Sequence, residues 1–259
     1  HRGGSIVPEV GTATPPTTGE AAGATTTAPA GPPTTDLSLR SPTAADPLRV
    51  WVGGDSQAQT FGQSLVEQAT ATGVMAPQLH YEISSGLARP DFYDWPGALK
   101  EDVAAHDPEV MVVFLGANDG QGLVLPDGTA VQHVSDPRWT MEYQRRVGAV
   151  MDQLRADHRL IVWVGEPPMR NADFDARMKI VNQAYAAEAA TRPWVVLVDS
   201  TPVLGDPSGA YADLVNDAAG TPVEVRAGDG IHLSRAGADR LAAQVLGVVQ
   251  SRTGGTGGR

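Results

Sequence analysis

The stretch Leu48-Arg49-Val50-Trp51-Val52-Gly53-Gly54-Asp55-Ser56 decides the fold of this chain. Its apolar residues predict a short buried strand over residues 49–53, which two glycines end, and a helical pattern begins directly afterwards. Ser56 therefore stands at the carboxyl end of a first strand, the edge at which open α/β sheets bind ligands. The free N–H groups and the positive dipole end of the helix point to the same place. These features suit a nucleophile, although a lone serine here is more typical of a helix N-cap.

Strand-like runs alternate with helical patterns along the rest of the chain. The apolar run from Val110 to Leu115, ended by Gly116, is typical of a central strand covered on both faces, whereas residues 78–83 are polar enough for an edge. The expected strands are 49–53, 78–83, 110–115, 160–165 and 195–199, and the expected helices are 58–72, a short one within 91–106, 138–155, 173–191 and 234–250. In helix 138–155 we expect Met141 to face the core. Pro126-Asp127-Gly128 suggests a small hairpin. The alternation predicts an α/β fold: a three-layer α/β/α sandwich around a flavodoxin-like, five-stranded parallel sheet of order 2-1-3-4-5.

Composition divides the 259 residues into three parts. Residues 1–46 are rich in Thr, Pro, Ala and Gly and lack aromatic residues, so they cannot bury enough surface to offset their ordering entropy, and we expect a disordered linker or stalk. We expect one domain over residues 47–250 and a flexible glycine-rich tail over 251–259. A linker of this composition suggests an exported protein, extracellular or at the cell envelope. Because the chain begins at His1, we expect a processed product with a signal peptide or membrane anchor upstream.

Bulk composition also excludes some classes of function. The chain has no cysteine, which rules out disulfides and thiolate chemistry. Its net charge of −11 argues against a nucleic-acid partner. His80, His106, His133 and His158 lack paired ligands at metal spacing, so we expect no metal site.

Four short stretches fall after expected strands or just before the last helix, and all of them would reach the carboxyl edge of the sheet. They are Gly54-Asp55-Ser56, Ser84-Ser85-Gly86, Gly116-Ala117-Asn118-Asp119 and Asp229-Gly230-Ile231-His232. A serine hydroxyl needs a base, and the imidazole of His232 is suited to that role. Asp229, three residues earlier, can accept the ring Nδ1–H and orient the imidazole. Taken singly, each residue has a structural interpretation as a cap, a turn or a satisfied histidine.

The same reasoning indicates where the oxyanion of an acyl-transfer reaction would bind. A tetrahedral intermediate needs donors aimed at its negative oxygen. The Ser56 backbone N–H, the Gly86 backbone N–H and the Asn118 side-chain amide are the candidate donors.

These four stretches resemble the SGNH/GDSL hydrolases, with Ser56, Gly86, Asn118 and His232 as the four name-giving residues. The resemblance covers residues 47–250 and implies a three-layer α/β fold and ester hydrolysis through an acyl-serine, without metal or cofactor. Gln57 departs from the leucine that the family often has there, and we expect this change to alter packing or pocket polarity and not the mechanism. Gly86-Leu87-Ala88-Arg89-Pro90-Asp91-Phe92, Trp95-Pro96, Trp139 with Tyr143, and Pro167-Pro168-Met169-Arg170 are similar to an exported bacterial subgroup.

Three further residues are candidates for substrate binding. Arg170 and Arg89 can bind an anionic group, but ion pairs with Asp91, Asp119 or Asp173 are an alternative role for them. Trp95 can stack on a sugar or pack in the core.

The main functional hypothesis is a serine esterase that hydrolyses a short O-acyl group such as acetyl, on a cell-envelope glycan. An O-acyltransferase that uses the same triad is the close alternative. A glycan-binding module without activity is the alternative from a different class.

Overall fold

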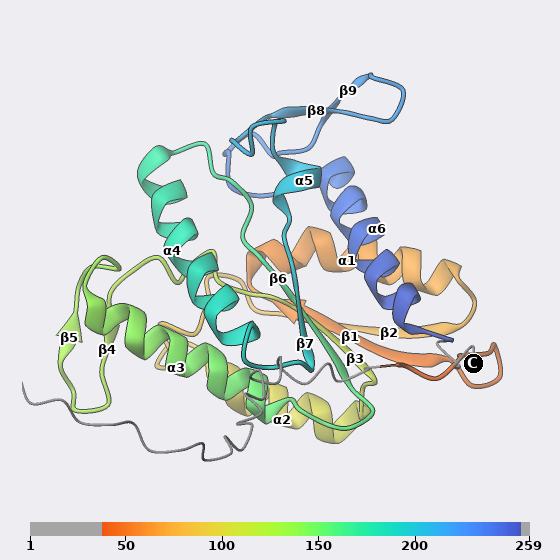
Figure 1. The fold of residues 1–259 in the computed structure, drawn as a ribbon, viewed down its shortest axis with the longest axis horizontal. Helices are drawn as coiled ribbons and strands as arrows, with labels where there is room; N and C mark the ends of the chain where they lie inside the picture. Colours follow the sequence, from red (N-terminus) through yellow and green to blue (C-terminus); the bar gives the residue numbers. More distant parts are fainter. Residues whose placement is uncertain (1–37, 255–259) are drawn as a thin grey trace, which may run out of the picture. The chain divides into compact units, whose positions relative to one another are not determined.

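The computed structural model describes residues 38–254 and has a parallel sheet at its centre (Figure 1). The order of its strands is β2-β1-β3-β6-β7. Their bounds are β1 Leu48–Gly54, β2 Met75–Tyr81, β3 Val110–Phe114, β6 Leu160–Val164 and β7 Val195–Val198. This order is the predicted 2-1-3-4-5, so the sequence prediction of a flavodoxin-like sheet is confirmed.

Helices cover both faces of the sheet. Figure 1 shows α1 (Ser56–Ala71) and α6 (Arg235–Arg252) on one side, and α2 (Trp95–His106), α3 (Pro137–Gln153) and α4 (Ala172–Ala189) on the other. Two buried apolar clusters fill the interfaces. Val50 and Val52 face the α1–α6 side, whereas Trp51 between them faces α2–α4. This alternation follows from the period of two in a strand, and it gives the predicted three-layer α/β/α sandwich.

Two details differ from the sequence prediction. Strand β2 begins at Met75, three residues earlier than expected, and runs through Pro77. A proline without an N–H is tolerated here because β2 pairs only with β1 at the edge of the sheet. Met141 does not face the core, since it is 70% exposed; Trp139 and Tyr143, four residues apart on α3, are the buried pair.

Short elements extend the loops. Strands β4 (Leu123–Val124) and β5 (Ala130–Val131) form a hairpin around the predicted turn at residues 126–128. Helix α5 (Thr201–Leu204) and the hairpin of β8 (Leu214–Asn216) and β9 (Pro222–Glu224) have no counterpart in the sequence prediction, because they are short and largely exposed.

The described end of the predicted linker packs against the domain. Leu39 is 7% exposed and its N–H donates to the Arg252 carbonyl at 2.7 Å. Arg40 pairs with Glu109 just before β3 at 2.6 Å. The prediction of a linker as far as residue 46 is therefore wrong from Leu39 onward, while residues 1–37 and 255–259 lie outside the described residues. No helix in the described range 38–254 is long and apolar enough to cross a membrane.

Candidate active site

A chain of hydrogen bonds joins Ser56, His232 and Asp229 at the carboxyl edge of the sheet. Ser56 Oγ lies 2.9 Å from His232 Nε2, and His232 Nδ1 lies 2.6 Å from Asp229 Oδ2. Asp229 Oδ1 also accepts the backbone N–H groups of Ile231 and His232, at 2.8 and 3.0 Å. The geometry is that of a nucleophile, a base and a group that orients the base.

The electrostatics of Asp229 suit its place in this chain. Desolvation would raise the pKa of its carboxyl, but hydrogen bonds from the His232 ring and from the Ile231 and His232 backbone outweigh it and hold the pKa at about 2. The carboxyl is therefore ionised at neutral pH. It can stabilise an imidazolium and keep the proton of the neutral ring on Nδ1, which leaves Nε2 free to accept the serine proton.

Asp55, and not Ser56, caps helix α1. Its carboxylate accepts the Gln57 N–H at 2.9 Å, and its carbonyl accepts the Ala58 N–H at 3.0 Å. The interpretation of Ser56 as an N-cap is thus wrong, since Ser56 is the first helical residue. Its side chain is free to meet His232. Its backbone N–H has no acceptor among the described residues.

The second oxygen of Asp55 joins β1 to the loop after β3. It accepts the N–H groups of Gly116 and Ala117, both at 2.9 Å. This clamp fixes the backbone that leads directly into Asn118. A side chain at Gly54 would collide with β3, because its Cβ would lie 1.8 Å from the Phe114 carbonyl oxygen. A glycine is therefore required at position 54 for this turn to approach the end of β3.

Asn118 lies against the loop that carries Gly86. Its amide Nδ2 donates one hydrogen bond to the Ser85 carbonyl at 3.0 Å, which leaves a second N–H for another acceptor. The Gly86 N–H has no acceptor in the described part of the chain. The structure thus brings the three candidate oxyanion donors, on Ser56, Gly86 and Asn118, to neighbouring loops at one edge of the sheet.

The buried carboxylate of Asp119 holds the loop that carries Gly86. Asp119 accepts the N–H groups of Leu87 and Ala88 at 2.9 and 2.8 Å and the Tyr143 hydroxyl at 2.6 Å. Tyr143 in turn lies 3.1 Å from the hydroxyl of Tyr185. Sequence reasoning gave Asp119 only an alternative role as an ion-pair partner, because nothing in the local pattern indicates that its partners come from loop 86–88 and helix α3.

Burial raises the pKa of three carboxyl groups beneath the site. Desolvation raises the pKa of Asp55 to about 6, against the lowering effect of the backbone N–H groups of Gly116, Gln57 and Ala117. Desolvation likewise raises the pKa of Asp119 to about 6. At Glu166, on the carboxyl side of β6, desolvation and the charges of Asp55 and Asp119 raise the pKa well above its usual range.

The three predicted substrate-binding residues occupy different environments. Trp95 is 1% exposed, and its indole N–H donates to Ser85 Oγ at 2.8 Å, so the prediction that it stacks on a sugar is wrong. Arg170 pairs with Asp213 at 2.6 Å and donates to the Gly228 carbonyl at 2.8 Å, so it braces the loop before His232. Trp95 therefore offers no open binding surface, whereas 45% of the Arg170 side chain is exposed and its role in substrate binding stays a prediction.

Arg89 is also accessible. It pairs with Asp91 at 2.7 Å, and 47% of its side chain is exposed. It lines a shallow hollow of about 680 Å³ together with polar groups from the hairpin region, among them Gln121 and Gln132. A role in substrate binding stays a prediction.

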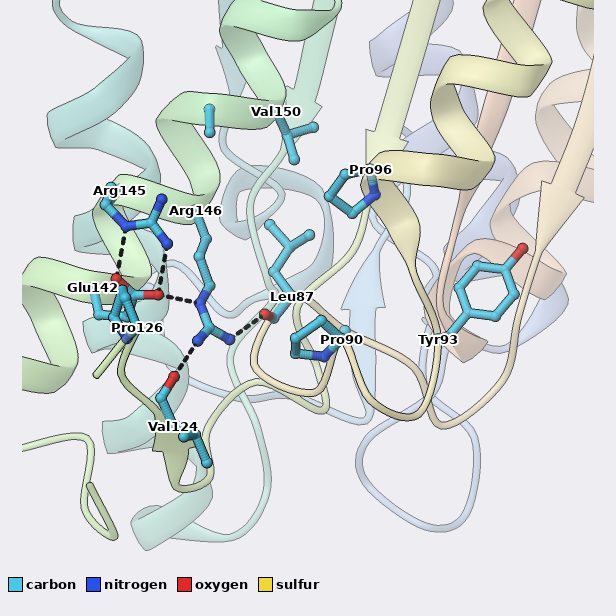
Figure 2. Close-up of a pocket in the computed structure, with 12 residues that line it drawn as sticks. Leu87, Pro90, Tyr93, Pro96, Val124, Pro126, Glu142, Arg145, Arg146 and Val150 are labelled. Atoms are coloured by element: carbon cyan, nitrogen blue, oxygen red, sulfur yellow. Dashed lines mark hydrogen bonds and ion pairs between the residues drawn. The ribbon is translucent and has the colours of Figure 1, made fainter. Parts of the chain in front are cut away.

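An apolar cavity of about 310 Å³ begins at Gly86 and continues between α2, α3 and the β4–β5 hairpin (Figure 2). Its lining is largely apolar and includes Leu87, Pro90, Tyr93, Pro96, Val124, Pro126 and Val150. Figure 2 shows Arg146 held between Glu142 and the carbonyls of Leu87 and Val124. Glu142 also pairs with Arg145 at 2.7 Å, so each charged group at the wall has an ion-pair partner, and the three together carry a net charge of +1. The cavity suits an uncharged apolar group. It shares Pro90, Val124 and Arg146 with the hollow that Arg89 lines.

No group of three or more His, Asp or Glu side chains within residues 38–254 is arranged to hold a metal ion.

One family model matches most of this chain. The sequence profile of a family described as "Protein of unknown function (DUF459)" matches residues 49–248. A search of the curated proteins gave no significant match.

Solved structures share the fold. A protein from Bacteroides fragilis described as an acylhydrolase is 16% identical with a TM-score of 0.55, covering 83% of this chain and 92% of its own. A GDSL-like lipase from Bacteroides thetaiotaomicron is 14% identical, with a TM-score of 0.52 and coverage of 78% and 88%. An acetylxylan esterase from Geobacillus stearothermophilus is 15% identical, with a TM-score of 0.52 and coverage of 77% and 92%. At these identities the similarity establishes the fold alone.

Proposed function

Because the chain belongs to the DUF459 family and has the fold of the SGNH/GDSL hydrolases, we propose that it is a serine esterase that cleaves O-acyl esters through an acyl-serine. One observation carries the proposal: Ser56, His232 and Asp229 form a continuous hydrogen-bonded chain, with unpaired donors on the neighbouring loops. A helix cap or a structural histidine does not require this combination.

Acylation begins when His232 Nε2 takes the proton of Ser56 Oγ. The oxygen attacks the ester carbonyl carbon and forms a new C–O bond, while the carbonyl electrons move to oxygen. The N–H groups of Ser56 and Gly86 and the Asn118 amide stabilise this oxyanion. The intermediate collapses, the bond to the alcohol oxygen breaks, and the imidazolium donates its proton to the departing alcohol.

Deacylation repeats these steps with water. His232 accepts a proton from a water molecule, whose oxygen attacks the acyl-serine carbonyl, and the proton then returns to Ser56 Oγ as the acid leaves. Asp229 stays ionised throughout and stabilises the imidazolium in both halves of the reaction.

We assign the two hollows beside the site to the two ends of the ester. The apolar cavity at Gly86 suits the acyl group, because its lining is largely apolar. The adjoining hollow, with Arg89, Asp91 and two glutamines, suits a polar alcohol such as a sugar. An acylated glycan of the cell envelope is the substrate that we propose.

The place where the N-terminal segment joins the domain fits such a role. Leu39 and Arg40 pack near the starts of β1 and β3, at the amino end of the sheet, whereas Ser56 lies at the carboxyl end. An enzyme tethered through this segment would present its active site away from the attachment point. Export and tethering are part of the proposal.

The test compares two serine variants of helix α1 on a short aryl acetate. We expect Ser56→Ala to lower kcat/KM by about 10⁴-fold or more, since the nucleophile is lost. Ser64→Ala is the matched control, because Ser64 is buried on the same helix and its hydroxyl has no partner in the described structure. Activity that survives Ser56→Ala, or absence of turnover in the wild type on a broad panel of esters, would refute the proposal.

A further inference from the structure

Gln57 makes a buried contact that the proposed mechanism does not use. It follows Ser56 on the first turn of α1 and is 1% exposed. Its side-chain Nε2 donates a hydrogen bond to the carbonyl of Ile231 at 3.0 Å, across 174 positions of sequence. Ile231 directly precedes His232. The Gln57 side chain, next to Ser56, therefore holds the backbone next to His232.

Stability does not explain a glutamine at this position. Its other amide atom, Oε1, is buried and has no partner among the described residues. A buried polar atom without a partner costs free energy, and an apolar side chain of similar volume would avoid this cost. A leucine at this position would have no such atom. The amide must therefore bring some other advantage.

That advantage lies in the peptide group between Ile231 and His232. Its carbonyl accepts from Gln57 and also from Arg226 Nη1 at 3.2 Å, and its N–H donates to Asp229 at 3.0 Å. The His232 carbonyl accepts from the Ala227 N–H at 2.8 Å. Of these contacts, the one from Gln57 connects the loop to the helix that carries Ser56. This hydrogen bond sets the position of the His232 loop relative to Ser56.

We propose that Gln57 is a positioning residue, which locks the His232 loop to helix α1 and keeps His232 Nε2 in line with Ser56 Oγ. The proposal rests on the proposed serine-esterase function. Gln57 does not touch substrate in this assignment. It acts through His232, so its loss changes proton transfer and leaves substrate binding intact.

The contacts make a distinctive prediction for Gln57→Met. The methionine keeps the volume but removes the donor, and the Ile231 carbonyl still accepts from Arg226, so no buried group loses its last partner. The unpaired Oε1 disappears as well. We expect kcat to fall about tenfold through misalignment of the base, with KM and Tm close to wild type.

A matched control comes from the same helix. Gln68 donates from its Nε2 to the Asp239 carbonyl at 2.9 Å and so links α1 to α6 through the same kind of bond, away from the His232 loop. Gln68→Met should leave kcat unchanged. The rate at which an aryl phosphonate labels Ser56 should fall in Gln57→Met by the same factor as kcat, because that reaction also needs the aligned base.

Gln57→Glu provides a second, independent readout. An ionised carboxylate cannot donate and would repel the Ile231 carbonyl, whereas a protonated carboxyl restores an O–H donor at the same position. We therefore expect the ratio of variant to wild-type kcat to rise as the pH is lowered.

The outcomes separate this inference from the proposed function. If the phosphonate does not label Ser56 in the wild type, the proposed function fails. If wild type is labelled and Gln57→Met reacts equally fast, the positioning role is refuted. A Gln57→Met variant that loses Tm or fails to fold refutes it too, since the contacts predict preserved stability. A flat pH ratio for Gln57→Glu likewise contradicts the donor role.

Discussion

Gly86→Ala should damage the oxyanion hole through a collision that the structure locates. A Cβ on Gly86 would lie 2.1 Å from Asp119 Oδ1 and 2.7 Å from Asp119 Cγ, whereas 3.4 Å is an ordinary contact. Asp119 cannot give way, because it is fully buried and accepts hydrogen bonds from Leu87, Ala88 and Tyr143. The loop that carries the Gly86 N–H must move instead.

The size of the effect follows from that displacement. The loop has to shift by about 1 Å, and a misplacement of this size lowers a rate by about 10²-fold. Overpacking of a filled interior costs about 1–3 kcal/mol of unfolding free energy. We therefore expect Gly86→Ala to lower kcat on a short aryl acetate by about two orders of magnitude and to lower Tm moderately.

The assay needs a control that makes the same substitution without the collision. Gly247 on α6 qualifies, because a Cβ there would meet nothing within 4 Å and its backbone lies in the α6 helix. Gly247→Ala should keep full activity and unfold no more easily than wild type. Wild-type kcat in Gly86→Ala would refute the reasoning, because the Gly86 N–H would then not be a donor that the loop must place accurately.

Three further predictions concern other parts of the site. Asp229→Asn should lower kcat by about 10²- to 10³-fold, because the asparagine disturbs the tautomer of His232. The loss should be smaller than for a fully buried aspartate, since 47% of the Asp229 side chain is exposed. Measuring kcat and kcat/KM of the variant against wild type checks this prediction. The pKa values of Asp55 and Asp119 are raised to about 6 in the folded protein, against about 3.8 in the unfolded chain, so the folded state binds more protons between pH 4 and 6. The free energy of unfolding should therefore increase as the pH falls from 7 to 5. A decrease in this free energy, measured by denaturant titration over the same range, would count against the prediction. Ala149→Phe places a ring at the apolar cavity and should shift the preference between butyrate and acetate esters by about tenfold toward acetate; an unchanged preference would place the acyl group elsewhere.

The fold was predictable from local pattern. Runs such as residues 110–115 are apolar throughout, which requires a strand covered on both faces, and alternation with helical segments leaves few arrangements other than a parallel sheet between helices. The order of the five strands then follows, because polar residues put β2 at an edge. The start of β2 was misplaced, since Pro77 ends most strands but is tolerated at an edge.

The members of the candidate site were also predictable, because the carboxyl ends of parallel strands meet at one edge of the sheet. Ser56, Gly86 and Asn118 all follow strands, and the spacing of Asp229 and His232 allows a carboxylate to meet an imidazole. Sequence alone predicted their proximity; the hydrogen bonds and the role of Asp55 as the cap of α1 came from the structure.

The supporting contacts were not predictable. Asp119 binds N–H groups about 30 residues away and a tyrosine on α3, and Gln57 reaches a carbonyl 174 positions distant. No local pattern specifies such partners, since they depend on how loops pack after the sheet has formed. Trp95 was misassigned for the same reason: a tryptophan after a turn is compatible with a binding face or a core, and packing decides between them.

The structure of the protein after reaction with an aryl phosphonate tests the central claim most directly. The account predicts a covalent bond from phosphorus to Ser56 Oγ, with His232 Nε2 beside it and the phosphonyl oxygen within hydrogen-bonding distance of the Ser56 and Gly86 N–H groups and the Asn118 amide. A phosphonate attached to any other residue, or a phosphonyl oxygen that points away from Gly86 and Asn118, would contradict it.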